Sequence, residues 1–369
     1  MRVIACRTPY GKGGLGQHFA QLIEESRESG DLTAYYAHVL KAGDESLGRR
    51  IDFVRMRFLK RFTPLRFSPP WVAYFGENIF DKRVAAALDI KAEAFMGFVG
   101  KSLYSFEKAR SLGYTRLELI AANSHVRNVQ RMHKMAEKQL GVRDTWLNDA
   151  LARKTMKEYE QADFIYTHSE YTRQSLINEG ISASKLKHTA LKVDDKFKPP
   201  VSKPNDGIFR IVYAGRVDVT KGIPLLIKAF SKLSQKRAEL TLVGGAATRR
   251  MKNQVARWMA EDSRIILAPG DPVLPFQAAD VYVHPSYEDG FAYAPMEALA
   301  CGVPAIVTED TGMKEHVKEG VNGYVVPTGN WEALLERMEH VLKHPLAQTV
   351  ATISKSAQVQ STVSESKIA

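Results

Sequence analysis

The sequence predicts an α/β protein built from two doubly wound domains. Its 369 residues exceed what one hydrophobic core usually fills, and 44% of them are hydrophobic, as in globular proteins. Short apolar runs alternate with segments of helical periodicity, which is typical of parallel sheets covered by helices. A stretch rich in proline and turn formers, 197–207, interrupts this alternation. The expected divisions are a first domain at 1–200, a linker at 201–207, a second domain at 208–345 and a polar, loosely ordered tail at 346–369.

The first domain opens on an apolar run, 3–6, that predicts a strand. A glycine-rich turn at 11–16 follows, and then a helix with apolar residues at helical spacing. Glycines in such a turn let backbone amides approach a phosphate at the helix start. Many α/β proteins have a glycine turn after their first strand, so the turn alone leaves its role open.

Charged and aromatic residues interrupt the periodicity between about 45 and 125, and element boundaries stay open there. Within this region the stretch 49–66 interleaves basic and apolar side chains. Its basic residues are Arg49, Arg50, Arg55, Arg57, Lys60, Arg61 and Arg66. A basic surface with apolar side chains can lie on an anionic membrane. The alternative is an amphipathic helix packed on its own domain with a solvated basic face.

The second domain contains six apolar runs separated by turn residues, most of them with a helical pattern in between. These predicted strands are 211–214, 240–243, 265–267, 281–283, 305–307 and 324–326. The series is that of one complete doubly wound domain.

Two cations, Arg216 and Lys221, lie in the turn between the first strand and the first helix of this domain. Cations are electrostatically misplaced near a helix N-terminus. A bound diphosphate would account for them, because fixed Arg and Lys groups stabilise the charge on a departing diphosphate. A solvated pair at a helix start is the alternative.

Two acids, Asp289 and Glu297, stand eight residues apart in the same domain. Asp289 lies in a glycine-containing turn after the strand 281–283, and Glu297 falls on the helix that follows. Both can therefore face one crevice beyond the carboxyl end of a strand, where carboxylates suit sugar hydroxyls. Acids at a solvated helix start would give the same spacing of two acids.

The order of these motifs resembles the retaining glycosyltransferases of family 4. In that family a Gly-Arg-x-x-x-x-Lys-Gly segment, found here at 215–222, precedes a donor-sugar motif whose usual form is Glu-Gly-Phe-Gly-x-Pro-x-x-Glu. The resemblance is strong over 208–345 and weaker in the N-terminal half. This chain departs from the usual form, because Asp289 replaces the first Glu and Ala292 and Ala294 replace Gly and Pro.

The resemblance implies the GT-B fold, with two Rossmann-like domains facing each other across a cleft and the donor mainly in the C-terminal one. It implies that Arg216 and Lys221 bind the donor diphosphate, Glu297 the nucleotide ribose, and Asp289 the sugar hydroxyls. The remaining residues that it implies at the donor are Gly14, Gly16, Gly290, Phe291 and Ala292. His125, which follows Ser124 before a long helical stretch, is the candidate at the reacting face, although a lone histidine is more often structural. The implied catalytic set is Arg216, Lys221, Asp289 and His125.

The function expected is therefore retaining transfer of a hexose from a nucleotide-diphosphate sugar to an acceptor hydroxyl, in surface-polysaccharide or glycolipid synthesis. No cofactor and no metal are expected. The partners are the donor, a carbohydrate or lipid-linked acceptor, and an anionic membrane surface through 49–66. The net charge of +11 also suits nucleic acid, but no recognised nucleic-acid motif accompanies it.

Two alternatives stay open: a GT-B nucleotide-sugar epimerase, and a catalytically inactive basic module that binds membrane or nucleic acid. A glycosidase is disfavoured, because the resemblance gives both acids binding roles. The chain shows neither a secretory signal nor a long apolar segment, so we expect a cytoplasmic protein, peripheral at the inner face of the membrane. The two cysteines, Cys6 and Cys301, sit inside predicted elements and indicate small buried groups, not a disulfide framework or a metal site.

Overall fold

The computed structural model describes residues 1–52, 58 and 61–346, and the chain divides into two compact units. The first comprises Met1–Arg131 and Thr145–Thr189, and the second Met132–Asp144 and Ala190–Ala369. The chain thus passes from the second segment of the first unit to the second unit at 189–190, ahead of the predicted linker at 201–207. Apart from Leu346, the predicted tail lies outside the described residues, as do 53–57 and 59–60 of the basic stretch.

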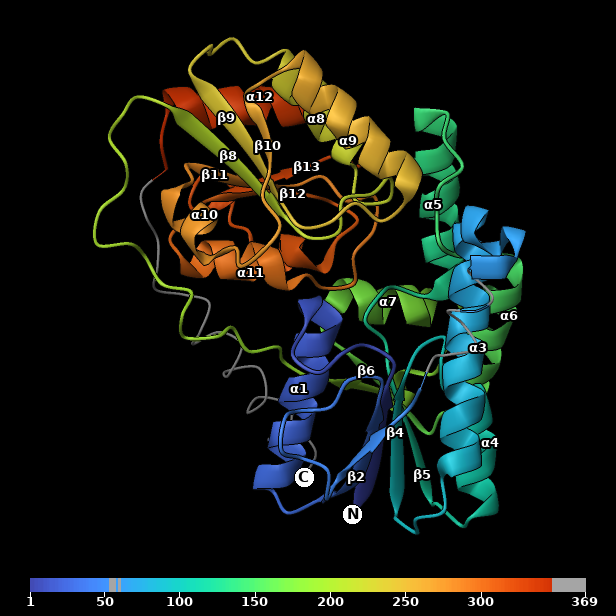
Figure 1. Cartoon of the computed structure of the whole chain (residues 1–369). Helices are drawn as coiled ribbons and strands as arrows, with labels where there is room; N and C mark the ends of the chain where they lie inside the picture. Colours follow the sequence, from blue (N-terminus) through green and yellow to red (C-terminus); the bar gives the residue numbers. More distant parts are fainter. Residues whose placement is uncertain (53–57, 59–60, 347–369) are drawn as a thin grey trace. The chain divides into compact units, whose positions relative to one another are not determined.

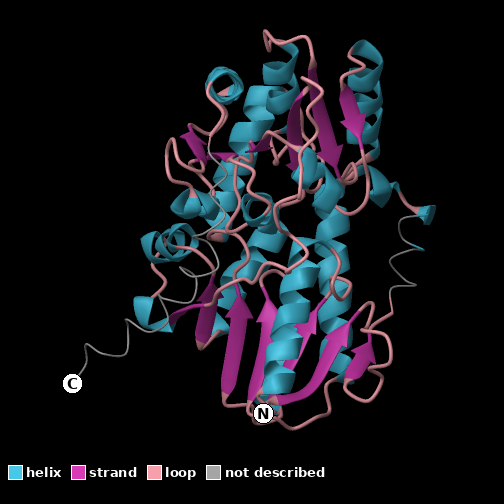
Figure 2. Cartoon of the chain, turned by 90° about the vertical axis from the view of Figure 1, so that its left-hand side faces the viewer, coloured by secondary structure: helices cyan, strands magenta, loops and turns pink. Residues whose placement is uncertain are grey.

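The first unit is a seven-stranded parallel sheet with helices on both faces (Figures 1 and 2). Its strands are β1 (Arg2–Cys6), β2 (Leu32–Ala37), β3 (Gly48–Arg50), β4 (Ala94–Phe98), β5 (Arg116–Ile120), β6 (Phe164–Thr167) and β7 (Leu186–His188). Its helices are α1 (Gly13–Glu28), α3 (Pro69–Ala87), α4 (Leu103–Ser111), α6 (Asp149–Gln161) and α7 (Glu170–Asn178), with 3-10 turns η1 (Pro64–Phe67) and η2 (Ala183–Lys185). Helix α5 (Val126–Leu140) begins in this unit and ends in the second.

Alternate residues along the strands β1, β2, β4 and β5 enter different cores, as the period of two requires. Val3 and Ala5 of β1 pack with side chains from α3, α4 and α6. Ile4 and Cys6 of the same strand pack with Phe19 of α1 on the other face. Both faces are apolar, which explains why the strands appear in the sequence as continuous apolar runs.

The second unit is a six-stranded parallel sheet, and it contains all six predicted strands. They are β8 (Phe209–Ala214), β9 (Ala238–Val243), β10 (Ile265–Leu267), β11 (Val281–His284), β12 (Ala305–Thr308) and β13 (Gly323–Val326). Helices α8 (Ile223–Ser231), α9 (Arg249–Glu261) and α12 (Trp331–Lys343) pack in the core of one face. Helices α10 (Val273–Ala278) and α11 (Tyr293–Ala300) pack in that of the other, and η3 (Gly312–His316) follows β12.

Each sheet reverses its strand order once. The first runs β3-β2-β1-β4-β5-β6-β7 and the second β10-β9-β8-β11-β12-β13. The order therefore switches between β1 and β4 in one unit and between β8 and β11 in the other. Crevices at the carboxyl ends of strands that flank such a switch are the usual ligand sites of open α/β sheets. The predicted α/β class with two doubly wound domains is confirmed.

Candidate functional site

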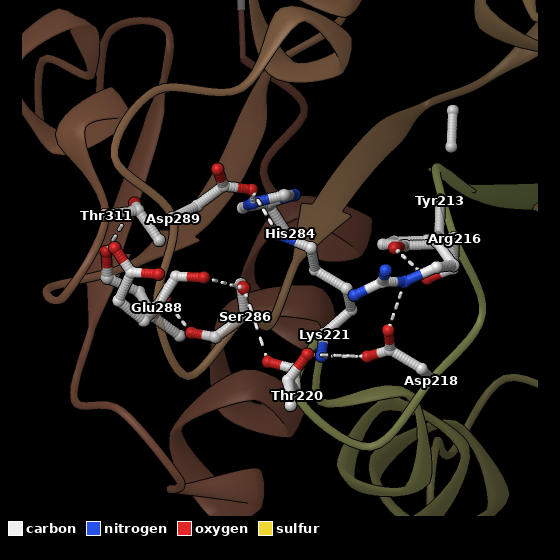
Figure 3. Close-up of polar contacts among 12 residues, drawn as sticks. Tyr213, Arg216, Asp218, Thr220, Lys221, His284, Ser286, Glu288, Asp289 and Thr311 are labelled. Carbon is white, nitrogen blue, oxygen red and sulfur yellow. Dashed lines mark hydrogen bonds and ion pairs between the residues drawn. The ribbon is translucent and has the colours of Figure 1, made fainter. Parts of the chain in front are cut away.

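The two predicted cations and one of the two predicted acids, Asp289, lie at the switch point of the second unit. Arg216 and Lys221 lie on the loop that follows β8, and Asp289 lies on the loop that follows β11, its neighbour in the sheet (Figure 3). Gly222 allows the two loops to pack together. Its φ is +67°, and a Cβ there would lie 1.9 Å from the carbonyl oxygen of Pro285. The glycine of the predicted Lys-Gly pair thus has a packing reason as well as a conformational one.

Asp218 fixes the first cation. Its Oδ2 lies 2.5 Å from Nε of Arg216, and its Oδ1 accepts from the Thr220 hydroxyl at 2.7 Å and from the backbone N–H of Lys221 at 2.8 Å (Figure 3). The Asp218 side chain is 3% exposed, whereas the Arg216 side chain is 47% exposed. The carboxylate is therefore buried beneath a guanidinium that solvent, or a ligand, can still reach.

Asp289 fixes the second cation. Its Oδ2 lies 2.6 Å from Nζ of Lys221 and 3.2 Å from Nε2 of His284. Burial by itself raises the pKa of Asp289, but the Lys221 ammonium and the His284 imidazole outweigh it and hold that pKa well below its usual range. Asp289 is therefore ionised at neutral pH.

His284 is a neutral support of this carboxylate. Burial lowers its pKa, and the hydrogen bond to Asp289 opposes that effect only in part. The neutral ring donates from Nε2 to Asp289, so that Nδ1 accepts from the Tyr282 hydroxyl at 3.1 Å. A buried chain of Tyr282, His284 and Asp289 thus leads from the strand β11 to Lys221.

The remaining predicted donor residues of this unit follow Asp289 directly. Gly290, Phe291 and Ala292 lead into α11, and the Phe291 ring packs edge-on against His316 with centroids 5.3 Å apart. Glu297 lies on α11, as predicted, and is 3% exposed. It therefore belongs to the buried side of the helix.

The predicted residues of the first unit lie within that unit alone. Gly14 and Gly16 fall in the first turn of α1, and a Cβ at Gly16 would lie 2.4 Å from the carbonyl oxygen of Pro9. His125 is 0% exposed and stacks on the Tyr159 ring with centroids 5.0 Å apart. Burial lowers the pKa of His125 to about 4, so its ring is neutral at pH 7. Its predicted place at the reacting face stays a prediction.

Three polar residues of the second unit were not among the predicted site residues: Asp218, His284 and His133. His133 lies on α5, in the segment that belongs to this unit, and is 5% exposed. Burial lowers its pKa to about 3, with Asp218 opposing and Arg216 and Lys221 adding to the effect. The sequence does indicate Asp218, since an acid between two cations is expected to form an ion pair with one of them. No pattern in the sequence predicts that α5 lies near this loop.

No helix in the described part of the chain combines the length and hydropathy needed to cross a bilayer. Residues 1–52, 58 and 61–346 contain no group of three or more His, Cys, Asp or Glu side chains placed to hold a metal ion. Both cysteines are free and buried.

The C-terminal part of the chain is similar to a known protein family. Residues 194–360 match the model of "Glycosyl transferases group 1". The capsular polysaccharide biosynthesis glycosyltransferase CapM of Staphylococcus aureus is 28% identical over 170 residues, which cover 45% of this chain and 44% of CapM. A D-inositol 3-phosphate glycosyltransferase of Pseudarthrobacter chlorophenolicus is 34% identical over 130 residues, 32% of this chain and 31% of that protein. The chain thus matches less than half the length of these curated relatives.

Solved structures resemble the chain over nearly its whole length. Sucrose-phosphate synthase from Thermosynechococcus elongatus superposes with a TM-score of 0.73 at 19% identity, covering 98% of this chain and 94% of the synthase. HepE of Anabaena in complex with UDP-glucose has a TM-score of 0.65 at 16% identity, covering 97% and 93%. At these identities the likeness establishes the fold, and the predicted GT-B type is confirmed. The predicted resemblance to group 1 glycosyltransferases is confirmed for residues 194–360.

Proposed function

We propose that this chain is a retaining hexosyltransferase that moves a sugar from a nucleotide diphosphate to an acceptor hydroxyl, in surface-polysaccharide or glycolipid synthesis. The observation that carries the proposal is the pair Arg216 and Lys221, held on one loop at the switch point of the second sheet by Asp218 and Asp289. The match of residues 194–360 to the group 1 family supports it.

The two cations suit a departing diphosphate. Cleavage of a sugar–diphosphate bond leaves negative charge on the phosphate oxygens, and cations fixed beforehand stabilise that charge without reorganising during the reaction. Arg216 offers planar, bidentate donors, while Lys221 offers a point charge. In this proposal the two cations do the work that other enzymes assign to a metal ion, and the donor phosphate accepts the proton of the attacking hydroxyl.

Asp289 suits a binding role for sugar hydroxyls. Its low pKa keeps it ionised, so it accepts hydrogen bonds and has no proton to give to a leaving group. Lys221 and His284 occupy Oδ2, whereas no side chain of the described residues forms an ion pair with Oδ1 or donates a hydrogen bond to it. A sugar hydroxyl can donate to that oxygen. This argues against the glycosidase alternative, in which one of two carboxylic acids must be protonated.

The proposed donor site is tested by measuring the unfolding temperature with UDP, GDP, ADP and their sugar conjugates, in the presence of EDTA. We expect one nucleotide to raise the unfolding temperature of the wild-type protein. Arg216→Met with Lys221→Met removes two charge-assisted contacts of about 1.5–3 kcal/mol each, which weakens binding at least a hundredfold. The control is Lys252→Met with Arg257→Met, which removes two exposed charges from α9 of the same unit.

The outcomes separate the candidate functions. A shift lost only in the site variant supports the proposal, and no shift from any nucleotide would refute it. Transfer of labelled sugar to an acceptor with the donor's anomeric configuration, followed by NMR, tests retention. Donor conversion to its epimer without acceptor would instead favour the nucleotide-sugar epimerase. Salt-sensitive lipid or nucleic-acid binding without nucleotide binding would favour the inactive module.

We further propose that the protein works at an anionic membrane surface, where a lipid-linked acceptor would be found. Exposed rings gather along the chain just where the basic stretch ends: Phe58, Phe62, Phe67, Trp71 and Phe75 are between 39% and 70% exposed. Exposed Arg49 and Arg50 and the Arg61 guanidinium near the Phe62 ring add positive charge. Aromatic side chains with neighbouring cations suit the headgroup region of an anionic bilayer. Co-sedimentation with vesicles containing phosphatidylglycerol, compared with phosphatidylcholine alone, tests this association.

A further inference from the structure

Two cations also flank the switch point of the first sheet. Arg7 follows β1 and Lys101 follows β4, the two strands between which the order of this sheet reverses. Arg216 and Lys221, in comparison, both follow a single strand at the switch point of the second sheet. Arg7 and Lys101 belong to the first unit, whereas the proposed donor site belongs to the second.

Glu77 of α3 bridges these two cations. Its carboxylate receives Nε and Nη2 of Arg7, each at 3.0 Å, and lies 3.8 Å from Nζ of Lys101. The Arg7 contact is a bidentate pair, whereas 3.8 Å is too long for a hydrogen bond. Two positive charges thus share one carboxylate, and only Arg7 is well paired with it.

Lys101 is nine-tenths buried with its donors unused. Its side chain is 9% exposed, and within the described residues its Nζ makes no hydrogen bond. A buried ammonium normally has hydrogen-bond partners, because desolvation of an unpaired charge is costly. Among the described residues, the Lys101 ammonium therefore has no negatively charged acceptor at hydrogen-bond distance.

The backbone around Lys101 is held rigidly. Glu158 of α6 accepts from the N–H groups of Gly100 at 2.5 Å, Ser102 at 2.8 Å and Leu103 at 3.1 Å. Glu158 is balanced on its other side by Lys154, whose Nζ lies 3.8 Å from it and 2.7 Å from Asp81. This neighbouring cluster sets two carboxylates against the one ammonium of Lys154, and its acids form no ion pair with Arg7 or Lys101. Among the described residues, Glu77 is the acid within ion-pair distance of these two cations.

We propose that Arg7 and Lys101 form an anion subsite in the first unit, which binds a phosphate group carried by the acceptor. The proposal rests on the proposed transferase function, since it names the chemical class of the acceptor. Glu77 occupies the subsite in the unliganded protein, and the incoming phosphate competes with it for the two cations. The Arg7 side chain is 41% exposed, so a ligand can reach the subsite from solvent.

The subsite is tested in full-length protein that lacks the proposed donor site, Arg216→Met with Lys221→Met, so that phosphate has no second cation pair to occupy. Inorganic phosphate is titrated at constant ionic strength, and the unfolding temperature is recorded. We expect a saturable rise. Adding Lys101→Met weakens phosphate binding about tenfold or more, as the loss of one charge-assisted contact does. Adding Lys187→Met removes an exposed charge that lies 5.1 Å from the Phe164 ring and leaves the titration unchanged.

Glu77→Gln separates a ligand site from a purely structural ion cluster. If Glu77 competes with the ligand, removal of its charge tightens phosphate binding several-fold, even though the variant is less stable without ligand. No rise with phosphate in the double variant, an equal rise with Lys101→Met, or no tightening with Glu77→Gln would each overturn the proposal. Nucleotide binding by Lys101→Met in the otherwise wild-type chain checks that the protein is folded, and it reports on the proposed function independently.

Two further probes distinguish the sources of the phosphate. Glycerol 3-phosphate is a soluble monoester, and glycerophosphoglycerol is a diester like that of a lipid headgroup. Tighter binding of the monoester in a Lys101-dependent manner supports a soluble acceptor, and tighter binding of the diester supports a lipid-linked one. Binding of neither, or binding that Lys101→Met does not affect, overturns the subsite.

Discussion

Replacement of Asp218 by asparagine tests whether this buried carboxylate places Arg216 for the donor. The carboxylate accepts from Arg216, Thr220 and the Lys221 backbone, and the side-chain amide of asparagine turns a donor toward one of them. Breaking a fully buried pair costs about 3–5 kcal/mol, but the Arg216 side chain is 47% exposed, so water screens part of the loss. We expect the free energy of unfolding to fall by about 2 kcal/mol.

The same substitution should also weaken nucleotide binding. An arginine that must be ordered again by the ligand binds less well, and a loss of about 1.4 kcal/mol corresponds to a tenfold higher Kd. The assays are urea unfolding and isothermal titration with the nucleotide found in the panel.

The matched control is Asp262→Asn, because Asp262 pairs with Arg264 across the same two-residue spacing, with Nη2 to Oδ2 at 2.7 Å. It should lose stability without a change in Kd. Equal Kd values for wild type and Asp218→Asn would refute the positioning role.

Three further expectations follow from the structure. Gly222→Ala places a Cβ 1.9 Å from the Pro285 carbonyl oxygen, at a left-handed φ of +67°. The backbone conformation alone costs ~1–2 kcal/mol, so the free energy of unfolding in urea should fall by more than that. Burial raises the pKa of Glu158 to about 7, so the folded protein holds this proton more tightly than the unfolded chain does. The stability of the wild-type protein should therefore fall relative to that of Glu158→Gln as the pH rises from about 5 to 8. Urea unfolding at each pH measures this difference. Burial raises the pKa of the Cys6 thiol and raises that of the Cys301 thiol to about 11. A thiol-specific reagent should therefore label neither cysteine in the native protein and both in urea. Rapid labelling of the native protein would contradict the burial of these thiols.

The sequence predicted the second unit more completely than the first. Strands β8 to β13 are apolar on both faces and are punctuated by turns, so their pattern is plain. Strands β3 and β7 have three residues each and at most one apolar side chain, so neither forms an apolar run in the sequence, whereas the equally short β10 is apolar throughout. The division of the chain between the units was out of reach for a different reason, because the segment Met132–Asp144 joins the second unit through contacts and not through its place in the sequence.

The candidate site could be predicted where its residues belong to short sequence motifs. Arg216, Lys221, Asp289 and Glu297 stand in motifs whose spacing implies their elements, and the structure places them on those elements. The grouping of Arg7, Glu77 and Lys101 depends on β1 and β4 being neighbours, which is a property of strand order. Periodicity identifies strands but does not order them, so this cluster became visible only with the sheet topology.

The second unit consists of two separate stretches of the sequence, because it includes the segment Met132–Asp144. Met132 and Ala136 fill its core, Gln139 accepts from the Tyr287 hydroxyl at 2.7 Å, and Asp144 accepts from the Thr248 hydroxyl at 2.6 Å. Residues 190–369 expressed alone would expose this core and leave Tyr287 and Thr248 without those partners. Exchange of nucleotide specificity between relatives by grafting the matched family region, 194–360, would therefore carry over an incomplete domain unless 132–144 travelled with it.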